Sequence, residues 1–316
     1  VARMPDVELL YFMDSKRRPV GAKRNDLMAM ARGTYISFID DDDSVADDYV
    51  RRIYRTLQRG ASVSIELNVQ NKFIDGDGMA FNVVGEIPGT DKAEDYLAGF
   101  PEHPHRGYET VTYMLDGRMR HRDNHGNEGL LTPGAVQWMT AGRGLVHSEM
   151  PEQESGRMRG FQLWVNLPSR DKMTAPKYQE FAPEKIPVAK PAKGVEVKVI
   201  AGTVGDTQGP ISQPATDPLY LDIALQPGHA WDYALPAGHN AFAYVFEGAV
   251  TVGEGDEARA LDTHEMGVLG GGDTLQVRAG TQPARLILVA GRPLREPVLR
   301  HGPFVMNTRQ ELMQAF

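Results

Sequence analysis

Cysteine is absent from this chain of 316 residues, and its absence removes several kinds of chemistry at once. Disulfide bonds, thiolate metal ligands and cysteine nucleophiles are all excluded. A metal site in this chain must therefore use histidine or oxygen donors. A chain without cysteine is also compatible with a reducing cytoplasm, which is the location that we expect.

Long apolar runs and an excess of basic residues are missing as well. No stretch reaches the about 18 consecutive apolar residues that a membrane-spanning helix needs, so no membrane contact is expected. The first residues lack the basic-then-apolar order and the cleavage site of a signal peptide. The net charge of −8 and the pI near 5.6 argue against a broad phosphate-binding surface. We therefore expect no direct nucleic-acid binding, and we expect a monomer.

Residues 1–65 show the pattern of a short α/β segment. Apolar strands are predicted for VELLYFMD and TYISFID. Helices are predicted for RNDLMAMARG and DDYVRRIYRTLQRG, each of which ends in a glycine.

Strand patterns replace helix patterns from residue 66 onward. Short alternating runs such as ETVTYML, GRMRHRD, GAVQWMT and FQLWVNL are bounded by Gly, Pro, Asn or Asp. Such runs are typical of an antiparallel sandwich or barrel. We expect a first barrel over residues 66–181, an exposed Pro/Lys-rich linker over 182–194, and a second barrel over 195–316. The second barrel should end in a short amphipathic helix.

The two β-rich halves repeat one pattern. The segments TYMLDGRM (112–119) and AYVFEGAV (243–250) each hold an aromatic-containing strand, an acidic-Gly turn and an outgoing strand. This internal repeat predicts a duplicated jelly-roll unit. The expected fold class is therefore mainly β, with two tandem jelly-roll barrels after the α/β segment.

The segment FPEHPHRGYETV (100–111) sets His103 and His105 two positions apart. In an extended strand that spacing directs both imidazoles to the same face, which favours one half of a metal site. A surface turn at the intervening proline is the better explanation of an isolated pair of this kind. The other half of a site must therefore be found elsewhere in the chain.

A second pair of donors lies in QWMTAGRGLVHSEMP, where His147 and Glu149 are again two positions apart. Three imidazoles and one carboxylate suit iron, manganese, copper, nickel or zinc. Such a set leaves one or two positions open on an octahedral ion, unlike the closed tetrahedral site of a structural zinc. The sequence therefore predicts one metal site with the ligands His103, His105, His147 and Glu149.

Over residues 91–316 the chain resembles the pirin family. The segments that carry the resemblance are HPHRGYETVTYML, LTPG, VQWMTAGRGLVHSEMP, FQLWVNLP and REPVLRHGPFVMNT. The resemblance implies a bicupin fold with one mononuclear iron, Fe(II) or Fe(III), in the first barrel. It places the iron ligands on the same four residues. The wider cupin pattern would instead nominate Glu109, which the resemblance to pirins leaves as a nearby polar residue.

The second barrel lacks an equivalent of this site. Ala234 and Pro236 occupy the places of the histidine pair, and no HxE pair follows. His239 and His264 have no partner of ligand type two residues further on, and we expect both to be turn or surface histidines. The second barrel should therefore have a structural role.

The resemblance implies two functions, which the sequence leaves open. One is a metal-dependent dioxygenase of the quercetin 2,3-dioxygenase type, with Glu149 as the catalytic base for a flavonol substrate. Trp138, Met139 and Phe100 are then candidate pocket walls, although barrel core explains each of them at least as well. Arg106 is a candidate ligand-orienting residue or forms a salt bridge at the rim. The other is a non-enzymatic regulator that acts through protein contacts and uses its iron as a redox sensor.

Residues 20–50 resemble a different family, the inverting GT-A glycosyltransferases. Their run SFIDDDDS matches the carboxylates that hold a divalent cation against a nucleotide-sugar diphosphate, here Asp40, Asp42 and Asp43. An acidic turn at the start of the following helix explains the same residues. The nucleobase-binding strand and the acceptor half of that family have no counterpart here, so the segment is interpreted as a fragment.

This interpretation predicts that nucleotide-sugars bind no tighter than the millimolar range, about −4 kcal/mol. The carboxylates would contact only metal and phosphate, because no base pocket accompanies them. Calorimetry with manganese and a uridine or guanosine diphosphate sugar measures this affinity. Micromolar binding would contradict the prediction.

Overall fold

The computed structural model describes residues 67–68, 71–73, 81–90, 96–97 and 99–316, except residues 256, 257 and 271. The predicted α/β segment, with its acidic run, lies outside the described residues. The chain divides into two units, Val1–Phe73 and Ile74–Phe316. In the first unit, β1 (Leu67–Asn68) pairs antiparallel with β2 (Asn71–Phe73). Among the described residues, no helix has the length and apolar character to cross a membrane.

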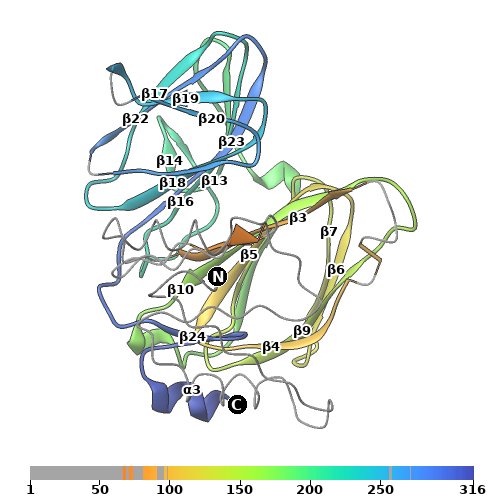
Figure 1. Ribbon diagram of the computed structural model, residues 1–316. Helices are drawn as coiled ribbons and strands as arrows, with labels where there is room; N and C mark the ends of the chain where they lie inside the picture. Colours follow the sequence, from red (N-terminus) through yellow and green to blue (C-terminus); the bar gives the residue numbers. More distant parts are fainter. Residues whose placement is uncertain are drawn as a thin grey trace, which may run out of the picture. The chain divides into compact units, whose positions relative to one another are not determined.

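Two antiparallel sheets form the first barrel of the second unit (Figure 1). One sheet has the order β3-β10-β5-β8-β11, and the other has the order β4-β9-β6-β7. Their strands are β3 (Phe81–Thr90), β4 (Phe100–His105), β5 (Tyr108–Asp116), β6 (Met119–Asp123), β7 (Glu128–Leu131), β8 (Val136–Thr140), β9 (Leu145–Pro151), β10 (Met158–Asn166) and β11 (Lys177–Phe181). The 3₁₀ turns η2 (Ser169–Asp171) and η3 (Pro183–Lys185) flank β11.

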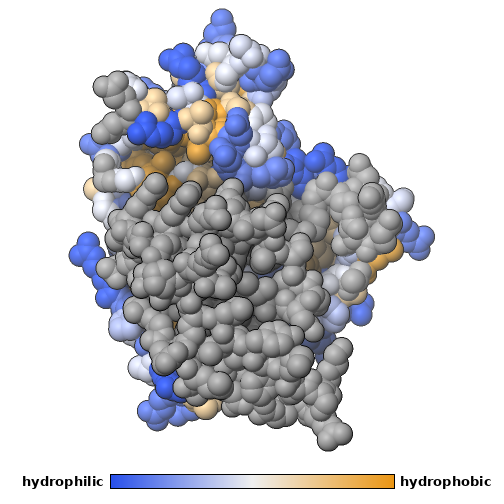
Figure 2. All heavy atoms as spheres, in the orientation of Figure 1, coloured by the Kyte–Doolittle hydropathy of each residue, from blue (hydrophilic) through white to orange (hydrophobic). Residues whose placement is uncertain are grey.

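The second barrel repeats this plan with sheets β12-β13-β16-β23-β18-β21 and β17-β22-β19-β20, beside a small hairpin β14-β15. Its strands are β12 (Val188–Ala192), β13 (Val195–Ala201), β14 (Thr203–Val204), β15 (Thr207–Gln208), β16 (Leu219–Leu225), β17 (Ala230–Ala234), β18 (Asn240–Glu247), β19 (Val250–Val252), β20 (Arg259–Leu261), β21 (Met266–Val268), β22 (Thr274–Ala279) and β23 (Ala284–Gly291). The visible face of this barrel, at the top of Figure 2, carries hydrophilic residues around a smaller group of apolar ones.

The predicted fold class is confirmed for the two barrels. The four strand runs expected from alternation in the first half coincide with β5, β6, β8 and β10, and the aromatic-containing strand of AYVFEGAV coincides with β18. The repeated acidic-Gly turn recurs as well, because Gly117 and Gly248 both have positive φ, 81° and 70°. The expected linker 182–194 is largely exposed, but its residues Val188–Ala192 form β12, which pairs with β13. We propose that the two barrels divide at this stretch.

A sheet buried on both faces joins the two barrels. Strand β5 is buried over its first seven residues, although the strand alternates its side chains between two faces. The outer face contributes Val111 and Tyr113 to an apolar cluster that also contains Tyr220, Phe242 and other residues of the second barrel. The hydroxyl of Tyr113 donates to Asp222 at 2.5 Å. Burial of this outer face is the reason that the first barrel needs the second.

The C-terminal segment covers the turn after the histidine pair. Strand β24 (Leu299–His301) pairs with β25 (Phe304–Met306), and helix α3 (Arg309–Ala315) follows with a capping box of Thr308 and Glu311. Arg106 and Phe304 form a β-bridge. Gly107 has φ +85°, and a Cβ there would lie 2.0 Å from the carbonyl oxygen of Val305. Only glycine therefore lets the C-terminal segment approach this turn so closely.

A buried lysine fastens this contact. Lys172 is 1% exposed, and its Nζ donates to the carbonyl oxygens of Gly107 (2.8 Å) and Val305 (2.9 Å) and to Asn166 Oδ1 (2.6 Å). Burial lowers the pKa of Lys172 from 10.5 to about 7. Between these two values the unfolded chain binds the proton more strongly than the folded chain does. The stability that this lysine contributes therefore rises with pH across that window.

We predict that Lys172→Met lowers the free energy of unfolding by about 2–4 kcal/mol at pH 9, because the buried acceptors around its amine lose their donor. The difference from the unsubstituted protein should be smaller at pH 7. Urea unfolding at both pH values measures the difference. The exposed Lys193→Met is the matched control and should leave stability unchanged at both pH values. A Lys172 difference that shrinks as pH rises would contradict the prediction.

Candidate metal centre

The predicted ligands lie on two paired strands of the first barrel. Strands β4 and β9 are antiparallel, and His103 lies directly opposite His147 in their register. Residues opposite each other in such a pair share one face of the sheet. His105 follows on the same face of β4, and Glu149 follows on the same face of β9. The strand register therefore brings the two donor pairs, which are 44 residues apart in sequence, to one place.

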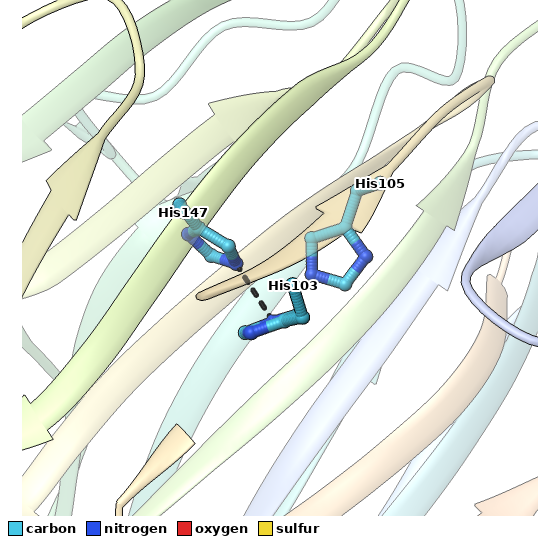
Figure 3. A group of neighbouring side chains, drawn as sticks. All are labelled: His103, His105 and His147. Atoms are coloured by element: carbon cyan, nitrogen blue, oxygen red, sulfur yellow. Dashed lines mark hydrogen bonds between the residues drawn. The ribbon is translucent and has the colours of Figure 1, made fainter. Parts of the chain in front are cut away.

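Three imidazole rings converge at this point (Figure 3). One nitrogen from each of His103, His105 and His147 can be chosen so that all lie within 4.8 Å of one another. The Nε2 atoms of His103 and His147 are 3.0 Å apart. Two metal–nitrogen bonds of about 2.1 Å at a right angle would separate their nitrogens by about 3.0 Å. The observed spacing therefore fits two adjacent ligands of one ion.

The outer nitrogens of His103 and His105 have hydrogen-bond partners outside the site, whereas the inward Nε2 atoms of His103 and His147 are hydrogen-bonded to each other. His103 Nδ1 lies 2.7 Å from the carbonyl oxygen of Pro101, to which it donates. His105 Nδ1 is hydrogen-bonded to the hydroxyl of Tyr108, and His105 Nε2 is buried without a hydrogen-bond partner. A buried imidazole nitrogen without a partner destabilises the folded protein, unless it binds a metal ion or accepts a hydrogen bond.

Burial also favours the neutral, metal-binding form of the histidines. The pKa of His105 lies well below its usual value because burial, and then the neighbouring His147 and His103, disfavour the cation. Burial likewise lowers the pKa of His147. Metal coordination needs the unprotonated ring, so these histidines are ready to bind at neutral pH.

Glu149 lies beside the histidines and is held firmly. Its carboxylate is buried, and its Oε2 is 3.9 Å from His147 Nε2. Gln162 Nε2 donates to both carboxylate oxygens, at 3.0 Å and 2.9 Å, and Thr112 donates to Oε1 at 3.2 Å. The 3.9 Å separation lies between the about 3.0 Å of adjacent ligands and the about 4.2 Å of opposite ligands on one ion. The fourth predicted donor is thus within reach of the same ion.

Glu109 faces away from this centre. It lies on the outer face of β5, where its Oε1 accepts hydrogen bonds from Thr140 (2.6 Å) and from Gln213 of the second barrel (2.6 Å). Burial raises the pKa of its carboxyl group. The strand period explains the difference, because an odd number of steps from Tyr108 places a side chain on the opposite face. The wider cupin pattern is therefore wrong for Glu109.

The other four side chains considered from sequence lie in four different surroundings. Trp138 belongs to the apolar cluster between the barrels, which corrects its assignment as a pocket wall. Met139 packs with Ala141 and Leu145 in a separate apolar cluster. Arg106 donates to the carbonyl oxygens of Arg143 and Gln314, so it fastens the C-terminal helix. Phe100 is 48% exposed.

Sequence reasoning missed the residues behind the ligands. Gln162, Thr112 and Tyr108 are polar-tipped side chains on strands that are otherwise apolar, and Gln162 lies opposite Thr112 in the β10–β5 register. A polar residue in a buried strand needs a partner, which is the signal that could have marked these positions.

In the second barrel, the histidines singled out from sequence have local hydrogen bonds. His239 Nε2 is 2.9 Å from the carbonyl oxygen of Asp217. His264 sits in a turn with φ 68°, and its Nδ1 is 3.2 Å from the hydroxyl of Tyr244. Within the described part of the chain, the one group of three or more close metal-binding side chains is the histidine group of the first barrel.

Comparison with known proteins places the chain in a family. The Pirin family model matches residues 54–165, and the model of the Pirin C-terminal cupin domain matches residues 220–316. A pirin-like protein of Caulobacter vibrioides is 59% identical over 228 residues, which are 72% of this chain and 80% of the relative. The chain belongs to the pirin family. Human pirin is 48% identical over 221 residues, 69% of this chain and 74% of the human protein.

A solved structure extends the comparison from the family to the fold. The crystal structure of quercetin 2,3-dioxygenase from Acinetobacter baumannii has a TM-score of 0.68 and 31% identity, and the match covers 81% of this pirin and 96% of that chain. Two cupin barrels are thus the fold of this pirin. A separate match, to the Glycosyl transferase family 2 model, spans residues 6–82, most of which lie outside the described residues.

We predict that His147→Ala loses most of the bound metal while the barrels stay folded. Loss of the His147 imidazole should weaken metal binding by more than 100-fold, because loss of a residue that only supports a ligand typically costs about 10- to 100-fold. Metal content by plasma mass spectrometry, together with circular dichroism, measures both effects. His229→Ala, in a turn of the second barrel, is the matched control. Full metal retention in His147→Ala would show that the assignment is wrong.

Proposed function

We propose that this pirin holds iron through His103, His105, His147 and Glu149 and acts as an oxidoreductase of the quercetin 2,3-dioxygenase type on flavonols. The observation that carries the proposal is the convergence of three histidines on two paired strands, with the carboxylate of Glu149 beside His147. Four protein ligands leave two positions of an octahedral ion open, which suits a metal that binds its substrate through two oxygen atoms.

A bidentate substrate matches two open positions. The 3-hydroxyl and 4-keto oxygens of a flavonol are adjacent on its ring system and can occupy neighbouring sites of one ion. Bound iron would supply a Lewis acid for these oxygens and a redox-active centre for dioxygen. The likeness to the A. baumannii protein, whose structure carries the name quercetin 2,3-dioxygenase, supports this substrate class.

Glu149 is the proposed catalytic base. A flavonol must lose its 3-hydroxyl proton to become electron-rich enough to react with dioxygen, and a carboxylate beside the ion is placed to accept that proton. Gln162 and Thr112 fix the carboxylate through three hydrogen bonds. These donors hold the carboxylate of Glu149 in one orientation beside the proposed metal site.

Oxygen consumption by the iron-loaded protein on a panel of flavonols tests the proposal. Turnover that scales with iron content supports a dioxygenase. A protein that binds one iron per chain and consumes no oxygen with any flavonol would contradict it. That result would favour the alternative role of a non-enzymatic regulator, in which the charge of Fe(III) relative to Fe(II) biases a protein contact.

We predict that Glu149→Gln lowers the rate of flavonol turnover by about 10²- to 10⁴-fold, the range typical of a lost general base. Rates should be compared at equal iron occupancy, because the substitution also removes a proposed ligand. Glu109→Gln is the matched control, since Glu109 is another buried glutamate of the same barrel but faces the second barrel. Equal rates for Glu149→Gln and the unsubstituted protein would exclude Glu149 as the base.

A further inference from the structure

Tyr108 lies directly behind one of the proposed ligands. It is the first residue of β5, its side chain is fully buried, and its hydroxyl is hydrogen-bonded to His105 Nδ1. The ring centroids of Tyr108 and His105 are 5.3 Å apart in an edge-to-face arrangement. No chemistry described above uses this phenol. A buried hydroxyl at the outer nitrogen of a histidine ligand can fix the tautomer and the orientation of the imidazole ring.

The hydrogen bond determines which nitrogen of His105 can coordinate. A neutral imidazole carries its proton on one nitrogen and its lone pair on the other. When Nδ1 donates its proton to the phenol oxygen, the lone pair is on Nε2, the buried nitrogen that has no hydrogen-bond partner. If Nδ1 instead accepted a hydrogen bond from the phenol O–H, the ring proton would be on Nε2, which could then not bind an ion.

We propose that Tyr108 is a positioning residue that holds His105 in the tautomer whose Nε2 lone pair faces the metal. The inference rests on the proposed metal centre and adds a determinant of its affinity. A hydrogen bond of this kind also increases the basicity of the coordinating nitrogen and restricts rotation of the ring. Tyr108 thus acts on the ion only through His105.

The three histidines differ in the hydrogen-bond partner of the outer ring nitrogen, and only the partner of His105 can be removed by a substitution. The outer nitrogen of His103 donates to a backbone carbonyl, which substitution cannot remove. The outer nitrogen of His147 has no hydrogen-bond partner. Among the outer nitrogens of the three histidines, only that of His105 is hydrogen-bonded to a side chain.

Trp164 holds Tyr108 in place and connects it to Glu149. The rings of Trp164 and Tyr108 pack with centroids 4.5 Å apart. The indole Nε1 of Trp164 donates to Gln162 Oε1 at 3.1 Å, and Gln162 in turn donates to the carboxylate of Glu149. One indole therefore supports two ligands, His105 through Tyr108 and Glu149 through Gln162.

The experiment compares Tyr108→Phe with Tyr113→Phe. Both substitutions remove one buried phenol from β5, but Tyr113 faces Asp222 on the outer face of the sheet. Chelator competition with Co(II) and Fe(II) gives the metal dissociation constant of each variant, independently of flavonol turnover. We expect Tyr108→Phe to raise that constant about 10- to 100-fold. Tyr113→Phe should leave it within about twofold, the ordinary scatter for a site with no shared contact.

Two spectroscopic readouts separate tautomer control from packing. The visible spectrum of the cobalt-saturated protein should change in Tyr108→Phe and not in Tyr113→Phe. In the unsubstituted, metal-free protein, nitrogen NMR of the histidine side chains should find the proton of His105 on Nδ1. That measurement needs no variant, so it stands even if Tyr108→Phe does not fold.

Several outcomes would overturn the proposal. These are a proton on His105 Nε2 in the metal-free protein, an unchanged metal dissociation constant in Tyr108→Phe, or equal weakening in both variants. A protein that binds metal as expected but oxidises no flavonol would leave Tyr108 in its role, and would contradict only the proposed function.

Discussion

The register between β4 and β9 is the constraint on which the centre depends. His103 opposite His147 places two donors across one pair of strands, and the two-residue period of each strand adds His105 and Glu149 on the same face. A shift of one residue would turn every donor of one strand to the other face of the sheet. The irregularity between Phe100 and His103 lies just before the first ligand, where the pairing with β9 becomes regular. The ligands thus owe their convergence to backbone pairing, and their own chemistry then selects the ion.

The sheet that contains β5, β8 and β10 separates two environments. Its inner face carries the polar residues that support the ligands, such as Thr112 and Gln162. Its outer face carries Val111, Tyr113, Val136 and Trp138, which pack against the second barrel. The second barrel therefore stabilises the first by covering an apolar surface that would otherwise face water. Its buried Asp222 is held by Arg285 at 2.6 Å and by Tyr113, so the charge at this interface is paired.

The C-terminal segment reaches back to the turn that follows the histidine pair. Gly107 allows the close approach of Val305, and Lys172 binds both carbonyl oxygens from the buried side. The guanidinium of Arg300, at the start of the same segment, lies 4.8 Å from the ring of Trp164. Residues nearly 200 positions away in the chain thus contact the structure behind His105. This arrangement rigidifies a ligand strand that lies at the edge of its sheet.

The sequence by itself determined the strand pattern, the duplication and the four candidate donors, because alternation and i, i+2 spacing are local properties of a chain. It also marked the second barrel as lacking the histidine pair, through Ala234 and Pro236. Only the tertiary structure decided which face of β5 meets which neighbour. Glu109 and Trp138 both lie in buried strands, yet both point toward the second barrel because the packing of two sheets assigns the inner and outer face. The roles of Tyr108, Gln162 and Lys172 likewise depend on partners from distant strands, and no local pattern encodes which distant groups a buried polar side chain will meet.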